Sequence, residues 1–421
     1  MGEQAGPTAL GNIRVCDFTG QLAGAGATRW MASFGAEVIK IEDPVRQGTW
    51  DILRGSPPFK DERRGIEFGP GFQNHNVEKR FITLNLRTDR ARELLAELVK
   101  ISDVVAENFA AGVLERMGLD YERLREMNAD VIYASNCGFG HTGPYRLFKS
   151  WGPIAQAVSG HTHNSGLPGR EPSGWGYSYL DHTGGYYMAM GIMLALLHRQ
   201  RTGEGQWIDM ACAEAGAYMH GADLLEWSVN GRSLRAEGIP DSNRSSAPVM
   251  APHGVYGCAG DDNWVAVACR SQEEWERLRA VAGSSGGREA GLEDGIFETL
   301  EGRVTHQDEL DSAMSAWTGS RTRWDVQEDL QRAGIAAAAV TRPSERIDLD
   351  ANTSAWGLWP MVDHEAMGGL RVDGEPVHFS KTDWSIKRAA PLLGGDNEFV
   401  FGEMLGLSQA EIGRLVEDGV I

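Results

Sequence analysis

The chain contains 421 residues, of which 42% are hydrophobic and 24% charged, and this composition excludes a disordered or fibrous protein. Its 40 lysine and arginine residues and 59 aspartate and glutamate residues give a formal net charge of −19, so we expect no nucleic acid partner. Residues 1–100 hold 14 basic and 13 acidic residues, so this part of the chain best tolerates an anionic ligand.

The predicted elements begin with an alternation of strands and helices. In residues 1–140, short β-branched runs alternate with helical patterns, which is typical of βαβ units and predicts an α/β fold with a parallel sheet. The predicted strands cover residues 13–18, 37–41, 81–84, 103–106 and 131–135, and the predicted helices cover residues 22–34 and 89–101.

Two segments, residues 42–78 and 160–180, lack periodicity and are expected to be long functional loops. The second leads into an apolar run at 186–197, which predicts a buried helix because it is shorter than the roughly 20 residues that a membrane span needs. A further helix is predicted over residues 212–229, and residues 230–250 are expected to be a linker.

The rest of the chain predicts a smaller α+β domain followed by short strands and a C-terminal helix in residues 360–421. We therefore expect a large domain over residues 1–225, a small domain over 226–340, and a C-terminal segment, 341–421, that returns to the large domain. In the small domain, a hairpin is predicted at 254–258 and 264–268, helices at 272–282, 307–318 and 323–333, and a strand at 336–340.

The cysteines are odd in number, widely spaced and free of Cys-x-x-Cys pairs. This argues against a disulfide framework or structural zinc and favours a reducing compartment. No basic region followed by an apolar run marks the N-terminus as a signal peptide, so a cytoplasmic protein without membrane contact is expected. The five cysteines are Cys16, Cys137, Cys212, Cys258 and Cys269.

Two patterns raise cofactor or metal alternatives. Gly20-Gln-Leu-Ala-Gly24-Ala-Gly26 follows a predicted strand, as in a dinucleotide fingerprint, but Arg29 stands where the motif requires a further glycine. Close packing of a helix on the sheet is therefore the favoured interpretation. His161, His163 and His182 lack a carboxylate at ligand spacing, so ordinary loop histidines are favoured over a metal site.

Asp181 lies between an aromatic-rich loop and the first turn of an apolar helix. A helix dipole favours the anionic form there, and Gly184 and Gly185 let a substrate approach backbone N–H groups. An ionised carboxylate can attack an activated acyl group, whereas the simpler alternative is an N-cap aspartate. The local pattern leaves both interpretations open.

Short motifs along the chain resemble those of the family III CoA-transferases, which include formyl-CoA transferase, carnitine CoA-transferase and the α-methylacyl-CoA racemases. They occur in the family's order from about residue 10 to the C-terminus. They are Val15-Cys-Asp-Phe-Thr19, Gly35-Ala-Glu-Val-Ile-Lys-Ile-Glu42, Glu78-Lys-Arg-Phe-Ile-Thr-Leu-Asn-Leu86, Ala106-Glu-Asn-Phe109, Arg116-Met-Gly118, Gly138-Phe-Gly140, Thr142-Gly-Pro-Tyr-Arg146, Arg201-Thr-Gly-Glu-Gly-Gln206 and Ala390-Pro-Leu-Leu-Gly394.

The resemblance implies an enzyme that moves CoA from an acyl-CoA donor to a carboxylic acid, with CoA as a substrate and no permanently bound cofactor or metal. Asp181 matches the family's nucleophile, which would form an aspartyl mixed anhydride and then an enzyme–CoA thioester. By motif position, Asn108, Phe109 and Arg116 would meet the nucleotide or pantetheine, Lys79 and Arg80 would lie near the phosphates, and Leu22 and Ala23 would line the thioester region.

The resemblance also implies a Rossmann-like large domain built from both chain ends, a smaller α+β domain and an interlocked homodimer. The chain departs from the family in three places: no glycine-rich run lies between Arg244 and Gly260, Cys137 replaces a lysine, and Trp151 stands where the racemases have a histidine. Without a second base, transfer is favoured over racemisation or isomerisation. A subunit of a hetero-oligomeric transferase, which would need a sister subunit, is a further alternative.

Overall fold

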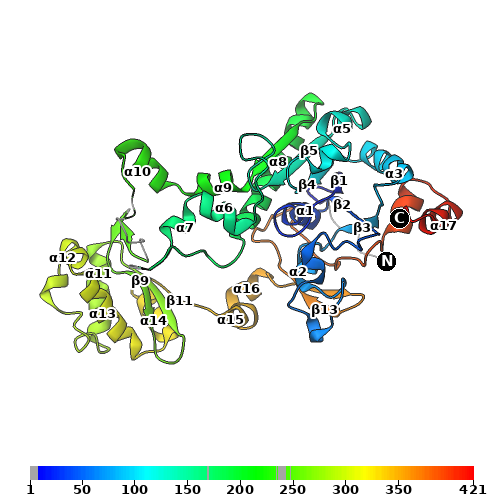
Figure 1. Ribbon diagram of the computed structural model, residues 1–421. Helices are drawn as coiled ribbons and strands as arrows, with labels where there is room; N and C mark the ends of the chain where they lie inside the picture. Colours follow the sequence, from blue (N-terminus) through cyan, green and yellow to red (C-terminus); the bar gives the residue numbers. More distant parts are fainter. Residues whose placement is uncertain (1–7, 168–169, 234, 236–242, 247) are drawn as a thin grey trace. The chain divides into compact units, whose positions relative to one another are not determined.

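The structure is a computed structural model that describes residues 8–167, 170–233, 235, 243–246 and 248–421 (Figure 1). The chain folds into two compact units. The first comprises Met1–His161, Gly174–Met219 and Ala351–Ile421, and the second comprises Thr162–Ser173 and His220–Asp350. The first unit therefore combines segments that lie far apart in the sequence.

The first unit contains a six-stranded parallel sheet with the strand order β3-β2-β1-β4-β5-β6. This order confirms the predicted α/β class with a parallel sheet. The direction in which successive strands are added to the sheet reverses between β1 and β4. In sheets of this kind, ligands bind at the carboxyl ends of the strands on either side of this reversal. The strands are β1 Arg14–Asp17, β2 Glu37–Glu42, β3 Arg80–Thr83, β4 Val104–Glu107, β5 Ile132–Cys137 and β6 Trp207–Ala211.

Both faces of the sheet are covered, because alternate strand residues point to opposite sides. On one face, Cys16 and Val105 pack with α3 (Asp89–Lys100) and with buried residues of α17 (Gln409–Glu417). On the other face, Val15 and Val104 pack with α1 (Ala23–Ser33) and α8 (Tyr179–Thr202). The C-terminal end of the chain thus completes the core beside the sheet.

Helix α8 packs closely on the start of α1. A Cβ atom on Gly185 would lie 2.5 Å from the Ala23 carbonyl oxygen, so only glycine permits this approach. The helix begins at Tyr179 and is longer than the predicted segment 186–197. Its first turn contains Leu180, which is fully buried in the core with α1.

The other elements of the first unit are short. The predicted loop 42–78 contains three helical turns, and the C-terminal part contains an antiparallel hairpin before its last helix, as predicted. These elements are η1 Ile52–Gly55, η2 Lys60–Glu62, α2 Pro70–Asn74, α4 Val113–Arg116, α5 Tyr121–Met127, α6 Gly152–Val158, α9 Cys212–Met219, α16 Ala351–Trp356, β12 Met361–His364, β13 Gly368–Arg371 and the π-helix η4 Glu398–Met404.

The second unit has a three-stranded antiparallel sheet of order β11-β10-β9, and the predicted hairpin and three helices are present. Trp275 and Trp317 are fully buried in its core. Its elements are α10 Ala222–Asn230, β7 Ser245–Ser246, β8 Val249–Met250, β9 His253–Gly257, β10 Trp264–Ala268, α11 Gln272–Gly283, η3 Gly295–Phe297, α12 Leu300–Thr305, α13 Gln307–Gly319, α14 Arg323–Arg332, β11 Ala336–Ala339 and α15 Pro343–Asp348. Helix α7, His161–Asn164, lies at the boundary of the two units.

Two sequence-based predictions need correction. The single helix predicted over 212–229 is wrong, because α9 ends at Met219 and α10 begins after Gly221, whose φ of 61° interrupts the helix. The predicted linker 230–250 contains the short β7–β8 pair, while its residues 234, 236–242 and 247 lie outside the described residues. Among the described residues, no helix has both the length and the apolar character that crossing a bilayer requires.

Candidate active site

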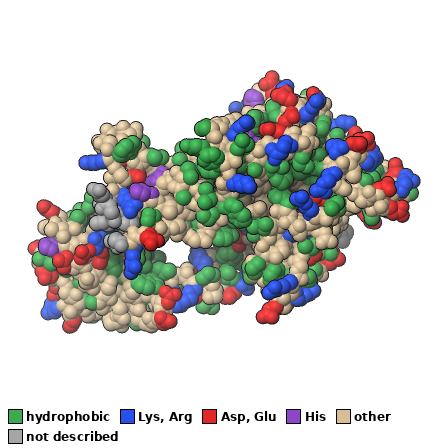
Figure 2. Space-filling view, viewed as in Figure 1, with side chains coloured by type: hydrophobic (Ala, Val, Ile, Leu, Met, Phe, Trp, Pro, Cys, Tyr) green, Lys and Arg blue, Asp and Glu red, His purple; other side chains and the backbone are tan. Residues whose placement is uncertain are grey.

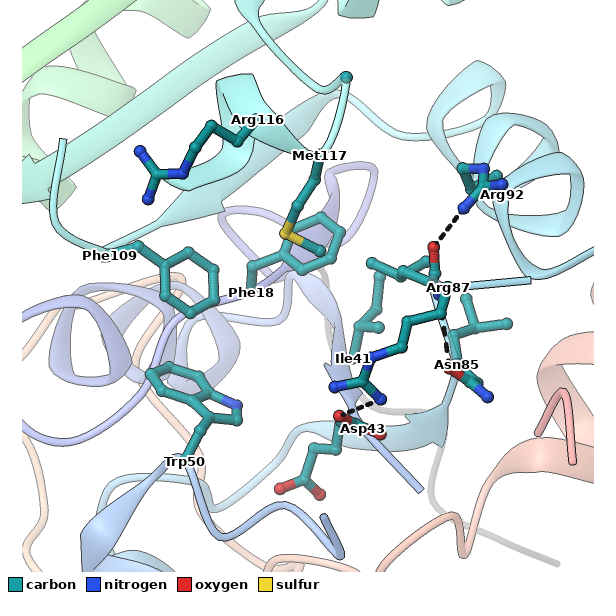
Figure 3. A pocket seen from close by; sticks show the side chains of 14 residues that line it. Phe18, Ile41, Asp43, Trp50, Asn85, Arg87, Arg92, Phe109, Arg116 and Met117 are labelled. Carbon is teal, nitrogen blue, oxygen red and sulfur yellow. Dashed lines mark hydrogen bonds and ion pairs between the residues drawn. The ribbon is translucent and has the colours of Figure 1, made fainter. Parts of the chain in front are cut away.

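Two cavities lie in the first unit, beside the carboxyl ends of its central strands. We name the first, of about 660 Å³, the arginine cavity, because Arg87, Arg92 and Arg116 line it (Figure 3). We name the second, of about 360 Å³, the Asp181 cavity, after the aspartate in its wall. Their position matches the ligand-binding edge expected for this strand order.

The arginine cavity carries an excess of positive charge. The Arg87 guanidinium lies 3.6 Å from Asp43, and Arg92 donates to the Leu86 carbonyl at 2.7 Å (Figure 3). The other acid in the wall, Glu42, is fully engaged by the buried Arg54 at 2.7 Å. The charged wall is therefore suited to a polyanionic ligand.

Arg116 is the arginine with the freest head group in this wall. It is exposed, and its guanidinium makes no hydrogen bond or ion pair with any described residue. It lies on α4, one turn after the loop that follows β4, and Figure 3 shows it beside Phe109. A charge held here without a protein partner can pair with a ligand phosphate.

Trp50 and Phe109 join the two cavities, since both residues line each of them. Their ring centres are 4.8 Å apart. Trp50 also packs over Gly20, where a Cβ atom would lie 2.3 Å from the indole ring. A long ligand could therefore extend from the arginines, past an aromatic pair, into the Asp181 cavity.

Asn108 holds together the loops that follow β1 and β4. Its Oδ1 accepts a hydrogen bond from the Gly20 N–H at 2.8 Å, and its Nδ2 donates to the Gly20 carbonyl at 3.0 Å. This double contact positions Leu22 and Ala23, at the start of α1, in the wall of the Asp181 cavity. The side chains predicted to line the thioester region thus lie beside the candidate nucleophile.

Asp181 is not the N-cap of α8, because Ser178 occupies that position and Asp181 lies in the first turn. Gly152 and Ser178 lie beside its carboxylate, since a Cβ atom on Gly152 would lie 2.9 Å from Asp181 Oδ2 and 2.8 Å from Ser178 Cβ. Burial raises the pKa of Asp181 above the ordinary value, while the Ser178 side chain and the Gly152 backbone oppose that shift by favouring the charged form. The carboxylate is therefore oriented and partly desolvated at a cavity wall.

Asn136 and Cys212 are cavity residues that sequence reasoning missed. The Cys212 thiol donates to Asn136 Oδ1 at 3.3 Å, whereas Asn136 Nδ2 is fully buried and finds no hydrogen-bond partner among the described residues. Both residues line the Asp181 cavity. A polar residue at the carboxyl end of the buried strand β5 was the signal that could have identified Asn136.

Lys79 and Arg80 were predicted to lie near the phosphates of a bound CoA. Within the described part of the chain, neither residue lines one of the two cavities. Lys79 is fully buried, with Nζ 3.2 Å from Asp17 Oδ2, and burial lowers its pKa to about 8 against the opposing charge of Asp17. Arg80 pairs with Glu37 and Asp396 at 3.2 and 3.3 Å.

The direction of β3 explains why these two residues do not line the cavities. Lys79 and Arg80 lie at its amino end, whereas Arg87 follows its carboxyl end and lines the arginine cavity. Of the eight residues predicted from motifs, the structure brings Leu22, Ala23, Asn108, Phe109 and Asp181 to the Asp181 cavity, and it brings Phe109 and Arg116 to the arginine cavity.

The histidines and the glycine-rich turn have local roles. In the described ranges, no three His, Cys, Asp or Glu side chains are grouped as metal ligands. His182 stacks on Tyr177, with ring centres 5.4 Å apart. A Cβ atom on Gly24 would lie 2.7 Å from Asn108, in agreement with the close-packing interpretation, and the buried Arg29 pairs with Glu375 at 2.7 Å.

Comparison with known proteins identifies the family of this chain. A family model described as CoA-transferase family III matches residues 10–397. The chain belongs to this family. Its resemblance to the family III CoA-transferases is thereby confirmed, and the chain is an enzyme of this class.

Several relatives are similar over nearly the whole length. Succinyl-CoA–D-citramalate CoA-transferase of Chloroflexus aurantiacus is 30% identical, covering 100% of both chains. Succinate–glutarate CoA-transferase of Agrobacterium fabrum is 31% identical, covering 94% of this chain and 95% of its own. The crystal structure of a CAIB/BAIF family protein from Brucella suis has 29% identity and a TM-score of 0.82, covering 94% of this chain and 99% of that one.

Proposed function

We propose that this enzyme transfers CoA from an acyl-CoA donor to a carboxylic acid through covalent acylation of Asp181. The observation that carries the proposal is the pair of cavities joined by Trp50 and Phe109. One elongated molecule can place anionic groups among arginines and a thioester beside a carboxylate. Coenzyme A has this form, with phosphates at one end and a sulfur at the other.

Three groups of residues would bind different parts of CoA. Arg87, Arg92 and Arg116 would neutralise phosphate charge, because guanidinium groups bind phosphates through two parallel hydrogen bonds. The pantetheine arm would cross the Trp50–Phe109 pair. Leu22 and Ala23 would then border the thioester, with Asn108 keeping their loop in place.

In the first half-reaction, an Asp181 carboxylate oxygen attacks the thioester carbonyl carbon, the carbon–sulfur bond breaks, and CoA leaves as a thiolate. The thiolate then attacks the aspartyl carbonyl of the mixed anhydride, which releases the donor acid and leaves CoA bound to Asp181 as a thioester. The acceptor carboxylate repeats these steps in reverse. The activation of the acyl group is retained only if water is kept away from the anhydride.

Asn136 Nδ2 supports this chemistry as a hydrogen-bond donor. It is buried, unpartnered among the described residues and part of the same cavity wall as Asp181. Negative charge develops on the carbonyl oxygen when the carboxylate attacks, and a positioned donor stabilises that charge more strongly in the transition state than in the ground state. We therefore assign Asn136 to the acyl carbonyl oxygen.

We infer that the substrates include dicarboxylic acids. Arg146 and Lys149 are exposed and line the Asp181 cavity, so they can meet a second carboxylate of a donor or acceptor. The names of two relatives contain succinyl-CoA or succinate and glutarate, which agrees with this class. The aromatic Trp151 in the same wall would contact the chain between the two carboxylates.

We further propose that two copies of the chain form a homodimer. Helix α8 carries an apolar stripe at helical spacing whose members are 42% to 62% exposed. In Figure 2, hydrophobic side chains gather over the unit that contains the sheet. Sedimentation of a stable monomer at micromolar concentration would contradict the dimer. The stripe consists of Tyr186, Met190, Leu194 and Leu197.

The function is tested with a panel of acyl-CoA donors and carboxylic acids, read by mass spectrometry of the CoA products. We expect Asp181→Asn to lose about a thousandfold or more in turnover with CoA affinity nearly intact, since a covalent step is removed. Asp120→Asn is the matched control, because Asp120 is a true N-cap that accepts from the Arg123 N–H at 3.0 Å.

A second readout follows the covalent intermediate. Hydroxylamine added during turnover should convert Asp181 into a hydroxamate, which peptide mapping detects. Transfer by the purified chain alone would exclude a required sister subunit. If no donor and acceptor pair exchanged CoA, or if Asp181 were never modified during exchange, the proposed mechanism would be wrong.

A further inference from the structure

Glu107 is a fully buried acid close to the Trp50–Phe109 pair. It is the last residue of β4, and its exposed fraction is 0%. Burial of an ionised carboxylate is costly unless hydrogen-bond donors satisfy its oxygens. Glu107 belongs to the described part of the chain but not to the wall of either cavity, so any effect that it has on a ligand must pass through neighbouring residues.

Donors from two loops surround the Glu107 carboxylate. Its Oε2 accepts a hydrogen bond from the Phe109 N–H at 2.7 Å. Its Oε1 accepts a hydrogen bond from the Tyr133 hydroxyl at 3.2 Å and lies 3.2 Å from His141 Nε2. Tyr133 belongs to β5, so the carboxylate connects the loop after β4 to the neighbouring strand.

The hydrogen bond to the Phe109 N–H extends the order of the sheet past the end of β4. Pairing between β4 and β5 stops at Glu107, which lies opposite Ser135, so the Phe109 N–H lies beyond the strand ladder. The ionised side chain supplies the acceptor that the ladder no longer gives. Asn108, between these two residues, is held by both of its hydrogen bonds to Gly20. The backbone is therefore anchored on both sides of the aromatic ring's attachment to the strand.

The Phe109 ring depends on this anchoring, because packing surrounds it only in part. Phe109 contacts the hydrophobic core, but it and Trp50 are half-buried and both line the two cavities. Their ring centres lie 4.8 Å apart, with the ring planes inclined by 44° (Figure 3). A ring with a free face keeps one position only if its backbone is held.

We propose that Glu107 is a positioning residue for the pantetheine arm of CoA. The inference rests on the proposed function in one respect, namely that this arm crosses the Trp50–Phe109 pair. By holding the Phe109 N–H, Glu107 keeps the aromatic pair in the arrangement that binds the arm and directs the thioester toward Asp181. Contacts between the nucleotide and the arginines do not require Glu107.

A purely structural role predicts a different result. A buried carboxylate that serves only the stability of the fold would, when replaced, lower the unfolding temperature. It would leave unchanged the ratio of the affinities for CoA and for its nucleotide part alone. The two roles are therefore separated by comparing CoA with adenosine 3′,5′-bisphosphate, which carries nucleotide phosphates but no pantetheine arm.

The test measures the Kd of both ligands by titration calorimetry with the purified full-length enzyme. Glu107→Leu should weaken CoA binding about tenfold, because an unanchored Phe109 must be ordered when the arm binds, and should change bisphosphate binding less than about twofold. Glu107→Gln keeps an oxygen acceptor at the same reach and should retain the wild-type affinity for CoA. Glu107→Asp is one methylene shorter and should weaken CoA binding as leucine does, which covers the case that Glu107→Leu fails to fold.

Asp396→Leu is the matched control. Asp396 is also a buried carboxylate that accepts a backbone hydrogen bond, from the Phe81 N–H at 2.8 Å, and it lines neither cavity. Below its unfolding temperature, this variant should keep both wild-type affinities. A double-mutant cycle tests the route, since Glu107→Leu should cause less than about a twofold further loss of CoA affinity when Phe109 is already alanine.

The outcomes distinguish this inference from the proposed function. Binding does not depend on turnover, so the affinities decide the inference even if no pair of transferase substrates is found. A folded Glu107→Leu or Glu107→Asp enzyme with the wild-type ratio of the two affinities would overturn it, and so would equal losses for both ligands. A tenfold effect that persists in the Phe109→Ala background would also overturn it, because Glu107 would then act on CoA by another route.

Discussion

Replacement of Gly152 by alanine perturbs Asp181 without touching its chemistry. Gly152 is the first residue of α6, and its backbone lies beside the Asp181 carboxylate and favours the charged form. A Cβ atom built there would lie 2.8 Å from Ser178 Cβ and 2.9 Å from Asp181 Oδ2. The backbone of Gly152 has no positive φ, so alanine introduces a contact problem and not a conformational one.

The expected magnitude follows from these distances. An ordinary contact begins at 3.4 Å, so the carboxylate must retreat by about 0.5 Å, and Ser178 on the other side of the methyl group must move as well. Since a displacement of about 1 Å can cost a factor of 100 in rate, we expect turnover to fall about ten- to a hundredfold. The Michaelis constant for CoA should change little, because the arginine cavity lies apart from the substitution.

The assay combines steady-state transfer with the rate of hydroxamate formation at Asp181, and thermal unfolding verifies that the variant is folded. Gly26→Ala is the matched control, because Gly26 also lies in a helix of the first unit but a Cβ atom there meets nothing within 4 Å. It should retain wild-type turnover. A folded Gly152→Ala enzyme with wild-type turnover would show that the position of this carboxylate does not limit the reaction.

Further predictions concern side chains that line the two cavities and the buried ion pair of Lys79. Arg116→Gln should raise the Michaelis constant for acyl-CoA about tenfold at nearly constant turnover number, as loss of one ion pair with a bound phosphate requires. Asn136→Leu should lower the turnover number about a hundredfold. Gln73→Met is the control, because it also removes a buried amide that lacks a partner among the described residues, and its kinetics should be unaffected. Lys79→Met should lower the free energy of unfolding by about 3–5 kcal/mol in chemical denaturation, because the buried Asp17 loses its ion-pair partner. Below the unfolding temperature, the Michaelis constant of this variant for CoA should be unchanged. Because burial raises the pKa of Asp181, the rate of its acylation should fall with decreasing pH through a value above that of an exposed aspartate, as measured in kcat/KM profiles. A carboxyl group whose pKa is raised by folding stabilises the folded protein while it is protonated, and this stabilisation is lost as pH rises through its pKa in the folded state. At neutral pH the Asp181 carboxylate therefore adds no stability, and Asp181→Asn should unfold at a temperature no lower than that of the wild type.

The sheet was predictable where strands are buried on both faces. Their sequences are continuous runs of β-branched residues, and the predicted boundaries of β1 to β5 agree with the structure to within two residues. Strand β6 escaped prediction because it lies at the sheet edge, with Trp207 and Asp209 exposed, and therefore lacks such a run. The interruption of the helix predicted over 212–229 depends on the backbone of a single glycine, Gly221.

The candidate site was predictable only in part, and mostly through motifs. Asp181, Asn108 and Phe109 were predicted as site residues from motifs that resemble those of the family, and the structure places all three in the wall of the Asp181 cavity. Gly152 and Ser178 favour the charged form of the Asp181 carboxylate, and only the tertiary structure brings Gly152 close to it. Lys79 was predicted to lie near the phosphates by its motif position. The sequence could not show its ion pair with Asp17, because Asp17 belongs to a strand that is distant in sequence.

The first unit needs the C-terminal segment for its core, and this affects when the unit can fold during synthesis. Val400, Phe401, Ile412 and Leu415 fill the core beside β1 to β5, and the Val420 carbonyl accepts a hydrogen bond from the Asn85 N–H at 2.8 Å. On the ribosome, all residues of the second unit, 162–173 and 220–350, emerge before the C-terminal residues that complete the core of the first unit. Chaperone dependence should therefore be greatest for nascent chains that already contain Asp181 but end before residue 400.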